Sequence, residues 1–297
     1  MILAEHIDKS FGRHRALQDL SFEVGDGQIV ALMGANGAGK STLFDILATV
    51  DPAFGGRALI DGIDVRTHPI EARGHIGYVP GRFSLYGDLS VAENLDFFAK
   101  AYGCAPEGIE SLSPHLWRSI RPFADQRAAN LSGGMKQKLS ICCAMVHNPS
   151  VLLLDEPTVG VDPLSRHDMW DELAALRAKG VTVLVSTHYL DEAAFADRIL
   201  FLHHGRKLLF DRPDAIAASY RHHLYSIPCT AAELPQIEAA LAQQEGILDY
   251  YLWGGHLHVA TDGDRAGTPI CGRPLQPVRP AIEDVFIDTL NASAKAV

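Results

Sequence analysis

One short segment of the chain combines glycines with a lysine and a serine at a spacing suited to phosphate chemistry. Residues Gly34 to Ser41 fit the pattern G-x-x-x-x-G-K-[ST] at every defined position. Glycines let a backbone wrap closely enough for its N–H groups to point at phosphate oxygens. Lys40 would add a mobile cation for the β and γ phosphates, and the Ser41 hydroxyl would be a ligand of Mg²⁺. The segment therefore predicts a phosphate-binding loop with an associated magnesium ion.

A pair of carboxylates forms the second candidate site. Asp155 and Glu156 follow directly after the apolar run Val151 to Leu154. The C-terminal end of a buried parallel strand lies at the ligand edge of its sheet. There Asp155 would hold Mg²⁺ through water, and Glu156 would orient a water for in-line attack on a γ-phosphorus. Alone, such a pair is more often a solvated loop, and it is the phosphate loop that favours the catalytic interpretation.

A third candidate is the sequence Ser132-Gly133-Gly134, which opens a helical stretch. The N-terminus of a helix attracts anions. The phosphate loop already provides a binding site for the phosphates of the chain's own nucleotide. A second anion site makes sense if it binds the nucleotide of another subunit. The alternative is a plain N-cap followed by flexible glycines.

The surrounding pattern predicts the elements that would hold these residues. The run 28–33, the glycine loop and a helix over 40–49 form the βα entry of a parallel α/β sheet. Residues 90–147 contain two long helical stretches, which we interpret as an insert in the sheet. Apolar strands at 151–154 and 181–186 then resume the sheet.

The composition shifts near residue 212, which predicts two domains. We expect a first domain over residues 1–211, with a helical subdomain at about 82–149, and a small α+β domain over 212–297. The second domain would combine strand-like runs at 222–228, 247–253 and 256–260 with helices at 233–244 and 282–290.

Composition excludes several classes of function. The 297 residues carry 26 Lys and Arg against 36 Asp and Glu, a net charge of −10, which argues against broad binding to duplex nucleic acid. The five cysteines show no C-x-x-C spacing, which argues against a disulfide framework or a zinc ribbon. No apolar run approaches the ~20 residues of a membrane-spanning helix.

In combination, these motifs resemble the ATP-binding subunits of ABC transporters over about residues 1–211. The resemblance implies a P-loop NTPase fold with a RecA-like core, and it implies ATP and Mg²⁺ as ligands. It also implies a head-to-tail dimer that sandwiches two ATP molecules. In such a dimer, the phosphate loop of one subunit faces the Ser132-Gly133-Gly134 segment of the other.

The resemblance also implies roles for single residues. Lys40 and Ser41 match the Walker A residues, and Asp155 and Glu156 match the Walker B aspartate and the catalytic glutamate. Catalysis would use Lys40, Glu156 and His188, where His188 matches the switch histidine, and Ser41 and Asp155 would hold the metal. The nucleotide-binding residues would be an adenine-stacking aromatic, the phosphate loop, the signature segment and the D-loop aspartate: Phe11, Gly34, Ala35, Asn36, Gly37, Ala38, Gly39, Lys40, Ser41, Thr42, Ser132, Gly133, Gly134 and Asp162.

One position departs from the family pattern. After the sequence Gly77-Tyr78-Val79-Pro80 the family normally has a glutamine that contacts Mg²⁺ and the attacking water, and this chain has Gly81. Because the other catalytic positions are intact, we expect an active ATPase. The alternative is a low-activity subunit that pairs with a different, active one.

The tail indicates a branch of the family. Residues 280–287 resemble the closing segment of ATP-binding subunits of multidrug-type exporters, whose ABC-2-type permease is a separate chain. This implies export of drugs, lipids or other hydrophobic compounds. The partners would be an integral-membrane permease, facing residues 83–89, and a second nucleotide-binding subunit, expected to be another copy of the chain. The location would be peripheral, on the cytoplasmic face of the membrane. The alternative is a soluble ABC ATPase that acts on ribosomes or nucleic acid.

Overall fold

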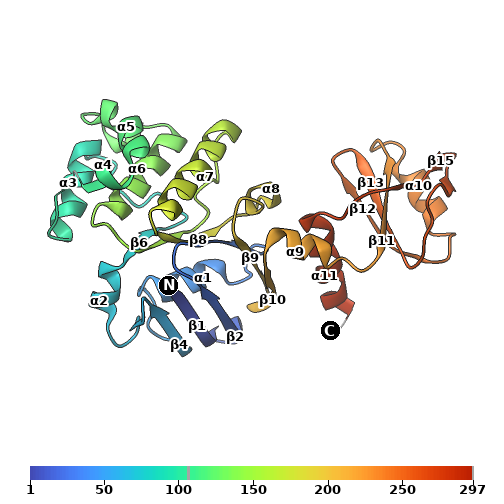
Figure 1. The fold of residues 1–297 in the computed structure, drawn as a ribbon, viewed down its shortest axis with the longest axis horizontal. Helices are drawn as coiled ribbons and strands as arrows, with labels where there is room; N and C mark the ends of the chain where they lie inside the picture. The colour runs from blue at the N-terminus through green and yellow to red at the C-terminus, as the bar shows by residue number, and fades with distance from the viewer. Residues whose placement is uncertain (106–107, 296–297) are drawn as a thin grey trace. The chain divides into compact units, whose positions relative to one another are not determined.

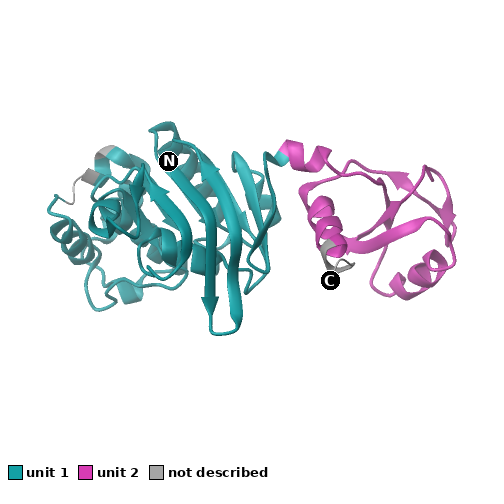
Figure 2. Ribbon diagram, turned by 90° about the horizontal axis from the view of Figure 1, so that it is seen from below, with its two compact units in different colours: residues 1–213 teal, residues 214–297 magenta. Residues whose placement is uncertain are grey.

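The computed structural model describes residues 1–105 and 108–295. The chain divides into two compact units, Met1–Pro213 and Asp214–Val297 (Figure 2). This division falls two residues after the expected one. Each unit has its own apolar core.

The larger unit is built around a six-stranded sheet in the order β10-β9-β3-β8-β7-β6 (Figure 1). All neighbours in it are parallel except the β9–β10 hairpin. The central strands β3, β8 and β7 are fully buried and mostly aliphatic, as a parallel sheet covered on both faces requires. The predicted α/β fold is therefore confirmed. The strands are β3 Ile29–Met33, β6 Ile76–Val79, β7 Val151–Leu154, β8 Thr182–Ser186, β9 Arg198–His203 and β10 Arg206–Asp211.

A second, antiparallel sheet of the larger unit has the order β2-β1-β4-β5. Its strands are β1 Ile2–Phe11, β2 His14–Val24, β4 Gly55–Ile60 and β5 Ile63–Asp64. The sequence analysis does not predict β1. Residues of both sheets share one core with the buried side chains of helix α1, Lys40–Leu47. The phosphate loop is thus anchored between two sheets.

The two long helical stretches predicted within residues 90–147 are confirmed as α3 and α6, whereas the short helices α2, α4, α5 and α8 are not predicted by the sequence analysis. α3 begins with a reciprocal capping box between Ser90 and Glu93, and Ser132 caps α6 by accepting a hydrogen bond from the backbone of Met135. Helices α3 to α6 gather on one side of this unit (Figure 1). The helices are α2 Pro69–Gly74, α3 Val91–Ala101, α4 Gly108–Leu112, α5 Pro114–Ile120, α6 Gly133–Met145, α7 Pro163–Ala178 and α8 Leu190–Ala193, with 3₁₀ turns η1 Arg121–Phe123 and η2 Ala128–Asn130. None of the helices in the described ranges is long and apolar enough to cross a membrane.

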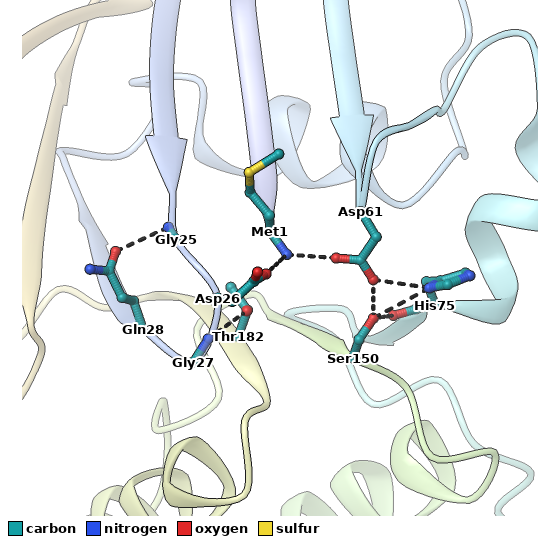
Figure 3. A network of polar contacts seen from close by, with 9 residues as sticks. All are labelled: Met1, Gly25, Asp26, Gly27, Gln28, Asp61, His75, Ser150 and Thr182. Atoms are coloured by element: carbon teal, nitrogen blue, oxygen red, sulfur yellow. Dashed lines mark hydrogen bonds and ion pairs between the residues drawn. The ribbon is translucent and has the colours of Figure 1, made fainter.

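A polar network joins the two sheets of the larger unit (Figure 3). Asp61, in the turn between β4 and β5, lies 2.6 Å from the ammonium nitrogen of Met1 and 2.9 Å from Nδ1 of His75. Ser150, just before β7, also donates a hydrogen bond to Asp61. Burial alone would raise the pKa of Asp61, but these hydrogen bonds outweigh it and leave the pKa below its ordinary value.

The smaller unit is an α+β arrangement. A four-stranded antiparallel sheet has the order β12-β13-β11-β16, and its core includes Ile237 and Leu241 of α10. Asp284 is buried in the last helix, where Tyr251 and His258 of the sheet and the backbone of Ala281 bond to its carboxylate. The elements are α9 Pro213–Ala218, β11 His223–Pro228, α10 Leu234–Leu241, β12 Ile247–Trp253, β13 His256–Thr261, β14 Pro269–Ile270, β15 Arg273–Pro274, β16 Gln276–Pro277 and α11 Ile282–Lys295.

Candidate nucleotide site

The phosphate loop runs from the end of β3 to the first residue of α1, as predicted. Its backbone fits only glycine at two positions. A side-chain carbon at Gly34 would lie 2.5 Å from the carbonyl oxygen of Leu202, and one at Gly39 would lie 2.5 Å from that of Ala16. Gly39 also has φ of 107°. No side chain caps α1, so its first N–H groups and its positive dipole end are available to an anion.

Lys40 lies inside this loop. Its side chain is 4% exposed, and Nζ donates hydrogen bonds to the carbonyl oxygens of Gly34, at 2.8 Å, and Ala35, at 3.3 Å. Nζ also lies 3.5 Å from Oε1 of Glu156. Burial lowers the pKa of the Lys40 ammonium, while the charge of Glu156 opposes that effect. The cation is therefore held where the loop would receive a phosphate group.

Asp155 and Ser41 bring two oxygen ligands together. The Ser41 hydroxyl donates to Oδ2 of Asp155 at 2.7 Å, and Ser186 donates to Oδ1 at 2.7 Å. The described ranges contain no cluster of three or more His, Cys, Asp or Glu side chains that could hold a metal ion alone. Mg²⁺ is usually held by one or two carboxylates together with substrate phosphates, and the Ser41–Asp155 pair beside the phosphate loop fits that requirement.

Glu156 and His188 are in direct contact. Nε2 of His188 lies 2.6 Å from Oε1 of Glu156, so the three residues predicted to be catalytic meet at this oxygen. Glu156 has φ of 51°, in the left-handed region, and its N–H donates to the Ser186 hydroxyl at 2.7 Å. Ser186 thus holds the carboxylate of Asp155 and the backbone of Glu156. The sequence analysis missed it, although its place two residues before His188 was a usable signal.

Phe11 lies beside the phosphate loop, at the end of strand β1 rather than in the loop that the sequence suggested. Its ring is 53% exposed, and the ammonium of Lys9 lies 4.8 Å from the ring centre. Together with His14 and Ala16 of β2, which the sequence analysis did not predict, Phe11 lines a cavity of about 220 Å³. The cavity is completed by Asn36, Gly37, Gly39, Lys40, Ser41, Thr42 and Glu156. An exposed aromatic face beside a phosphate loop is suited to stacking on a nucleobase.

The signature segment and the D-loop lie next to each other. A side-chain carbon at Gly133 would lie 3.3 Å from the carbonyl oxygen of Gly160. Asp162 caps α7 by accepting a hydrogen bond from the backbone of Ser165 at 3.0 Å. The described residues that line the cavity at the phosphate loop include neither Ser132 to Gly134 nor Asp162. Within one chain, these residues therefore lie outside the cavity at the phosphate loop.

Comparison with known proteins agrees with this geometry. A family model described as "ABC transporter" matches residues 17–159. The Nod factor export ATP-binding protein I of Rhizobium sp. (strain N33) is 33% identical over 297 residues, covering 95% of this chain and 94% of the relative. The chain belongs to the family of ATP-binding proteins of ABC transporters.

Two further similarities concern the length and the fold of this ABC protein. The probable multidrug ABC transporter ATP-binding protein YbhF of Escherichia coli (strain K12) is 39% identical over 222 residues, which are 73% of this chain and 38% of the relative's length. A solved dimeric structure of a bacterial ABC transporter cassette has 28% identity and a TM-score of 0.64, covering 71% of this chain and 98% of the cassette.

At Gly81, this ABC protein departs from the family pattern beside the two carboxylates. A side-chain carbon at Gly81 would lie 3.3 Å from the carbonyl oxygen of Asp155 and 3.5 Å from its Oδ2. A cavity of about 370 Å³ opens there, lined by Ser41, Tyr78, Pro80, Gly81, Arg82, Asp155 and Glu156. A side chain at this position would lie beside Asp155, one of the two proposed Mg²⁺ ligands, and glycine leaves that space open.

Proposed function

We propose that this chain binds and hydrolyses ATP and thereby powers an exporter whose permease is a separate integral-membrane protein of the ABC-2 type. The observation that carries the proposal is the meeting of Lys40, Glu156 and His188 at one carboxylate oxygen, beside the Ser41–Asp155 pair. Cation, base and metal ligands thus surround one point at the phosphate loop, as phosphoryl transfer to water requires.

The residues divide the chemistry among them. The uncapped N-terminus of α1 and the Lys40 ammonium bind the β and γ phosphates. Ser41 and Asp155 hold Mg²⁺, which when bound neutralises phosphate charge. Glu156 orients a water and accepts its proton as the water attacks the γ-phosphorus. His188 donates a hydrogen bond to the γ-phosphate and helps to fix Glu156. Phe11 stacks on the base.

A second copy of the chain completes each site in this proposal. Ser132, Gly133 and Gly134 stand at the N-terminus of the 13-residue helix α6, and the adjacent D-loop carries Asp162. Since these residues do not line their own phosphate cavity, we infer that they face the ATP of the partner subunit. The solved cassette shares this fold and is described as dimeric, which supports a dimer.

The permease would bind between the sheet and the helical subdomain. A cavity of about 230 Å³ opens there, lined by Ala48, Arg73, Ile76, Tyr78, Val79, Pro80, Ser84, Leu85, Phe98, Tyr102, Ser140, Cys143 and Ala144. The rings of Phe83, Tyr86 and Phe97 near this region are exposed. An apolar surface with aromatic side chains and few charges suits the core of a protein interface. The cavity includes Pro80, which is adjacent to Gly81. A permease segment bound in the cavity would therefore lie close to the proposed Mg²⁺ ligand Asp155.

The transported molecule would be a drug, a lipid or another hydrophobic compound. The names of the E. coli and Rhizobium relatives, which refer to multidrug transport and Nod factor export, support this class. The protein would lie at the cytoplasmic face of the membrane through its permease, without a nucleic-acid partner, and the smaller unit over about 212–297 would serve as an accessory or regulatory domain.

The proposal is tested by capture on the Glu156→Gln variant. This change should block hydrolysis and retain bound ATP, so the assembled transporter accumulates when membranes are solubilised with Mg-ATP. Recovery of a multi-span membrane protein, lost when Leu85→Asp is added, would support the permease partner. Recovery of ribosomal or nucleic-acid components instead would contradict it. The rate of phosphate release by the wild-type homodimer distinguishes the two alternatives for the subunit. Steady release supports an active ATPase, and very slow release supports a low-activity subunit that pairs with a different, active one.

A further inference from the structure

Glu192 is a buried carboxylate behind the nucleotide site. It lies on the short helix α8, and the residue is only 4% exposed. Its Oε2 accepts hydrogen bonds from the hydroxyls of Thr158, at 2.9 Å, and Thr187, at 2.6 Å, and its Oε1 accepts one from Nη1 of Arg166 at 3.3 Å. A buried charge is tolerated only when it is paired and hydrogen-bonded, and these three bonds provide that.

The two threonines place Glu192 between the catalytic segments. Thr158 follows Glu156 by two residues, and Thr187 directly precedes His188. The side chains of His188 and Glu156 contact each other at 2.6 Å. The hydroxyls of Thr158 and Thr187 both donate to Oε2 of Glu192. The contacts therefore form a closed ring that fixes one catalytic segment against the other.

The groups around this ring fix the direction of the hydrogen bond from Thr187 and balance the charge of Glu192. The hydroxyl of Thr187 accepts a hydrogen bond from the backbone N–H of Tyr189 at 3.0 Å, so its own proton is directed to Glu192. The guanidinium of Arg166, on α7, lies 4.1 Å from the centre of the Tyr189 ring and supplies the charge that balances Glu192. A carboxylate is needed here because all three neighbours donate.

We infer that Glu192 is a positioning residue for hydrolysis, which sets His188 and Glu156 in their reactive geometry without contact with the nucleotide. The inference rests on the proposed ATPase function and goes beyond it. Phosphoryl transfer depends on placement, and a small displacement of a catalytic group lowers the rate strongly. Loss of the Glu192 charge should therefore affect turnover and leave ATP binding intact.

The test compares Glu192→Gln with a matched control, Glu172→Gln. Glu172 is a carboxylate on α7 that is 7% exposed, accepts a hydrogen bond from Ser113 and lies 3.2 Å from Nδ1 of His115, away from the nucleotide site. For Glu192→Gln we expect kcat to fall by about 10- to 100-fold, the range usual for outer partners of a reactive group, with the Kd for a fluorescent ATP analogue within about twofold. For Glu172→Gln we expect a lower melting temperature with kcat within about twofold of the wild type.

A double-mutant cycle separates positioning from general damage. Thr187→Val removes one donor but keeps the pair of Glu192 with Arg166, so it remains informative if Glu192→Gln does not fold. We expect Thr187→Val to lower kcat, and we expect the double variant to be no slower than Glu192→Gln alone. The inference would be overturned if Glu192→Gln or Thr187→Val had the kcat of the wild type. It would also be overturned if the two variants had additive losses of kcat, or if Glu172→Gln lost as much kcat as Glu192→Gln. These outcomes would leave the proposed ATPase function standing. A wild-type chain that does not hydrolyse ATP would overturn the proposed function as well.

Discussion

Oε1 of Glu156 lies 2.6 Å from Nε2 of His188, and the same oxygen lies 3.5 Å from Nζ of Lys40. The candidate base thus contacts the two groups that we propose bind the γ-phosphate. Lys40 also donates to two carbonyls of its own loop. Because a phosphate competes for the same N–H donors, ATP would draw Lys40 and His188 away from Glu156. The carboxylate would then be free to accept a hydrogen bond from water.

Glu156→Gln should abolish turnover while retaining nucleotide binding. The amide keeps the shape of the side chain but cannot accept a proton, and loss of a general base lowers rates by about 10²- to 10⁴-fold. Phosphate release measures the rate, and size-exclusion chromatography with Mg-ATP should show more dimer than the wild type. A variant with unchanged kcat would remove Glu156 from the catalytic role.

Lys40→Met should weaken ATP binding. The loss of charged hydrogen bonds to phosphate is worth about 1.5–3 kcal/mol, which corresponds to a Kd for ATP raised by roughly 10- to 150-fold. Fluorescence titration or calorimetry measures this affinity. Lys100→Met is the matched control, because Lys100 is an exposed lysine of α3 paired with Asp96. An unchanged Kd in Lys40→Met would contradict the placement of the phosphates.

The sequence places the candidate site residues on the right strands and helices where its signals are local. The phosphate loop, the carboxylate pair and the helix caps at Ser90 and Ser132 are each encoded within a few neighbouring residues. These segments also form the strands and helices that the apolar periodicity indicates. The α/β class follows because the buried strands 29–33 and 151–154 are continuous apolar runs and strand 182–186 has three consecutive aliphatic residues, a pattern typical of a covered parallel sheet.

The sequence cannot predict features that depend on distant contacts. Strand β1 contains polar residues at several positions, and it is stabilised by pairing with β2 and β4 on either side. Glu192 reads as a surface residue near the end of a strand, and it becomes buried only when Thr158, Thr187 and Arg166 surround it. Because these partners lie 5 to 34 residues away, no local pattern marks their contact with Glu192.

Gly81→Gln should raise turnover if this position normally contacts the metal region. A side-chain carbon there would lie 3.5 Å from Oδ2 of Asp155 and 3.3 Å from its carbonyl oxygen, so the backbone must shift by a few tenths of an ångström, and the cavity of about 370 Å³ has room for the amide. One added hydrogen bond to a charged group is worth about 1.5–3 kcal/mol, so kcat should rise by roughly 10-fold or more. Gly81→Leu, which adds bulk without polar atoms, should give no gain. Equal kcat in the wild type and in Gly81→Gln would show that this chain reaches full rate without the glutamine.

Asp61→Asn should destabilise the larger unit in a pH-dependent way. The folded-state pKa of Asp61 is depressed, since its hydrogen bonds outweigh the effect of burial. Its stabilising contribution is therefore fully present above the unfolded pKa of about 3.9 and is lost as the pH falls through the folded value. At pH 7 the variant should lose about 0.5–1.5 kcal/mol of unfolding free energy, the usual net contribution of a hydrogen bond, because Met1 and His75 are partly exposed and water can replace the lost partner. The difference from the wild type should shrink below about pH 4. Urea denaturation followed by circular dichroism measures both values.

Asp171→Asn, at a side chain that is 74% exposed, should show no such dependence. A deficit in Asp61→Asn that stays constant down to pH 3 would contradict the role of the charge and leave only the packing of the turn.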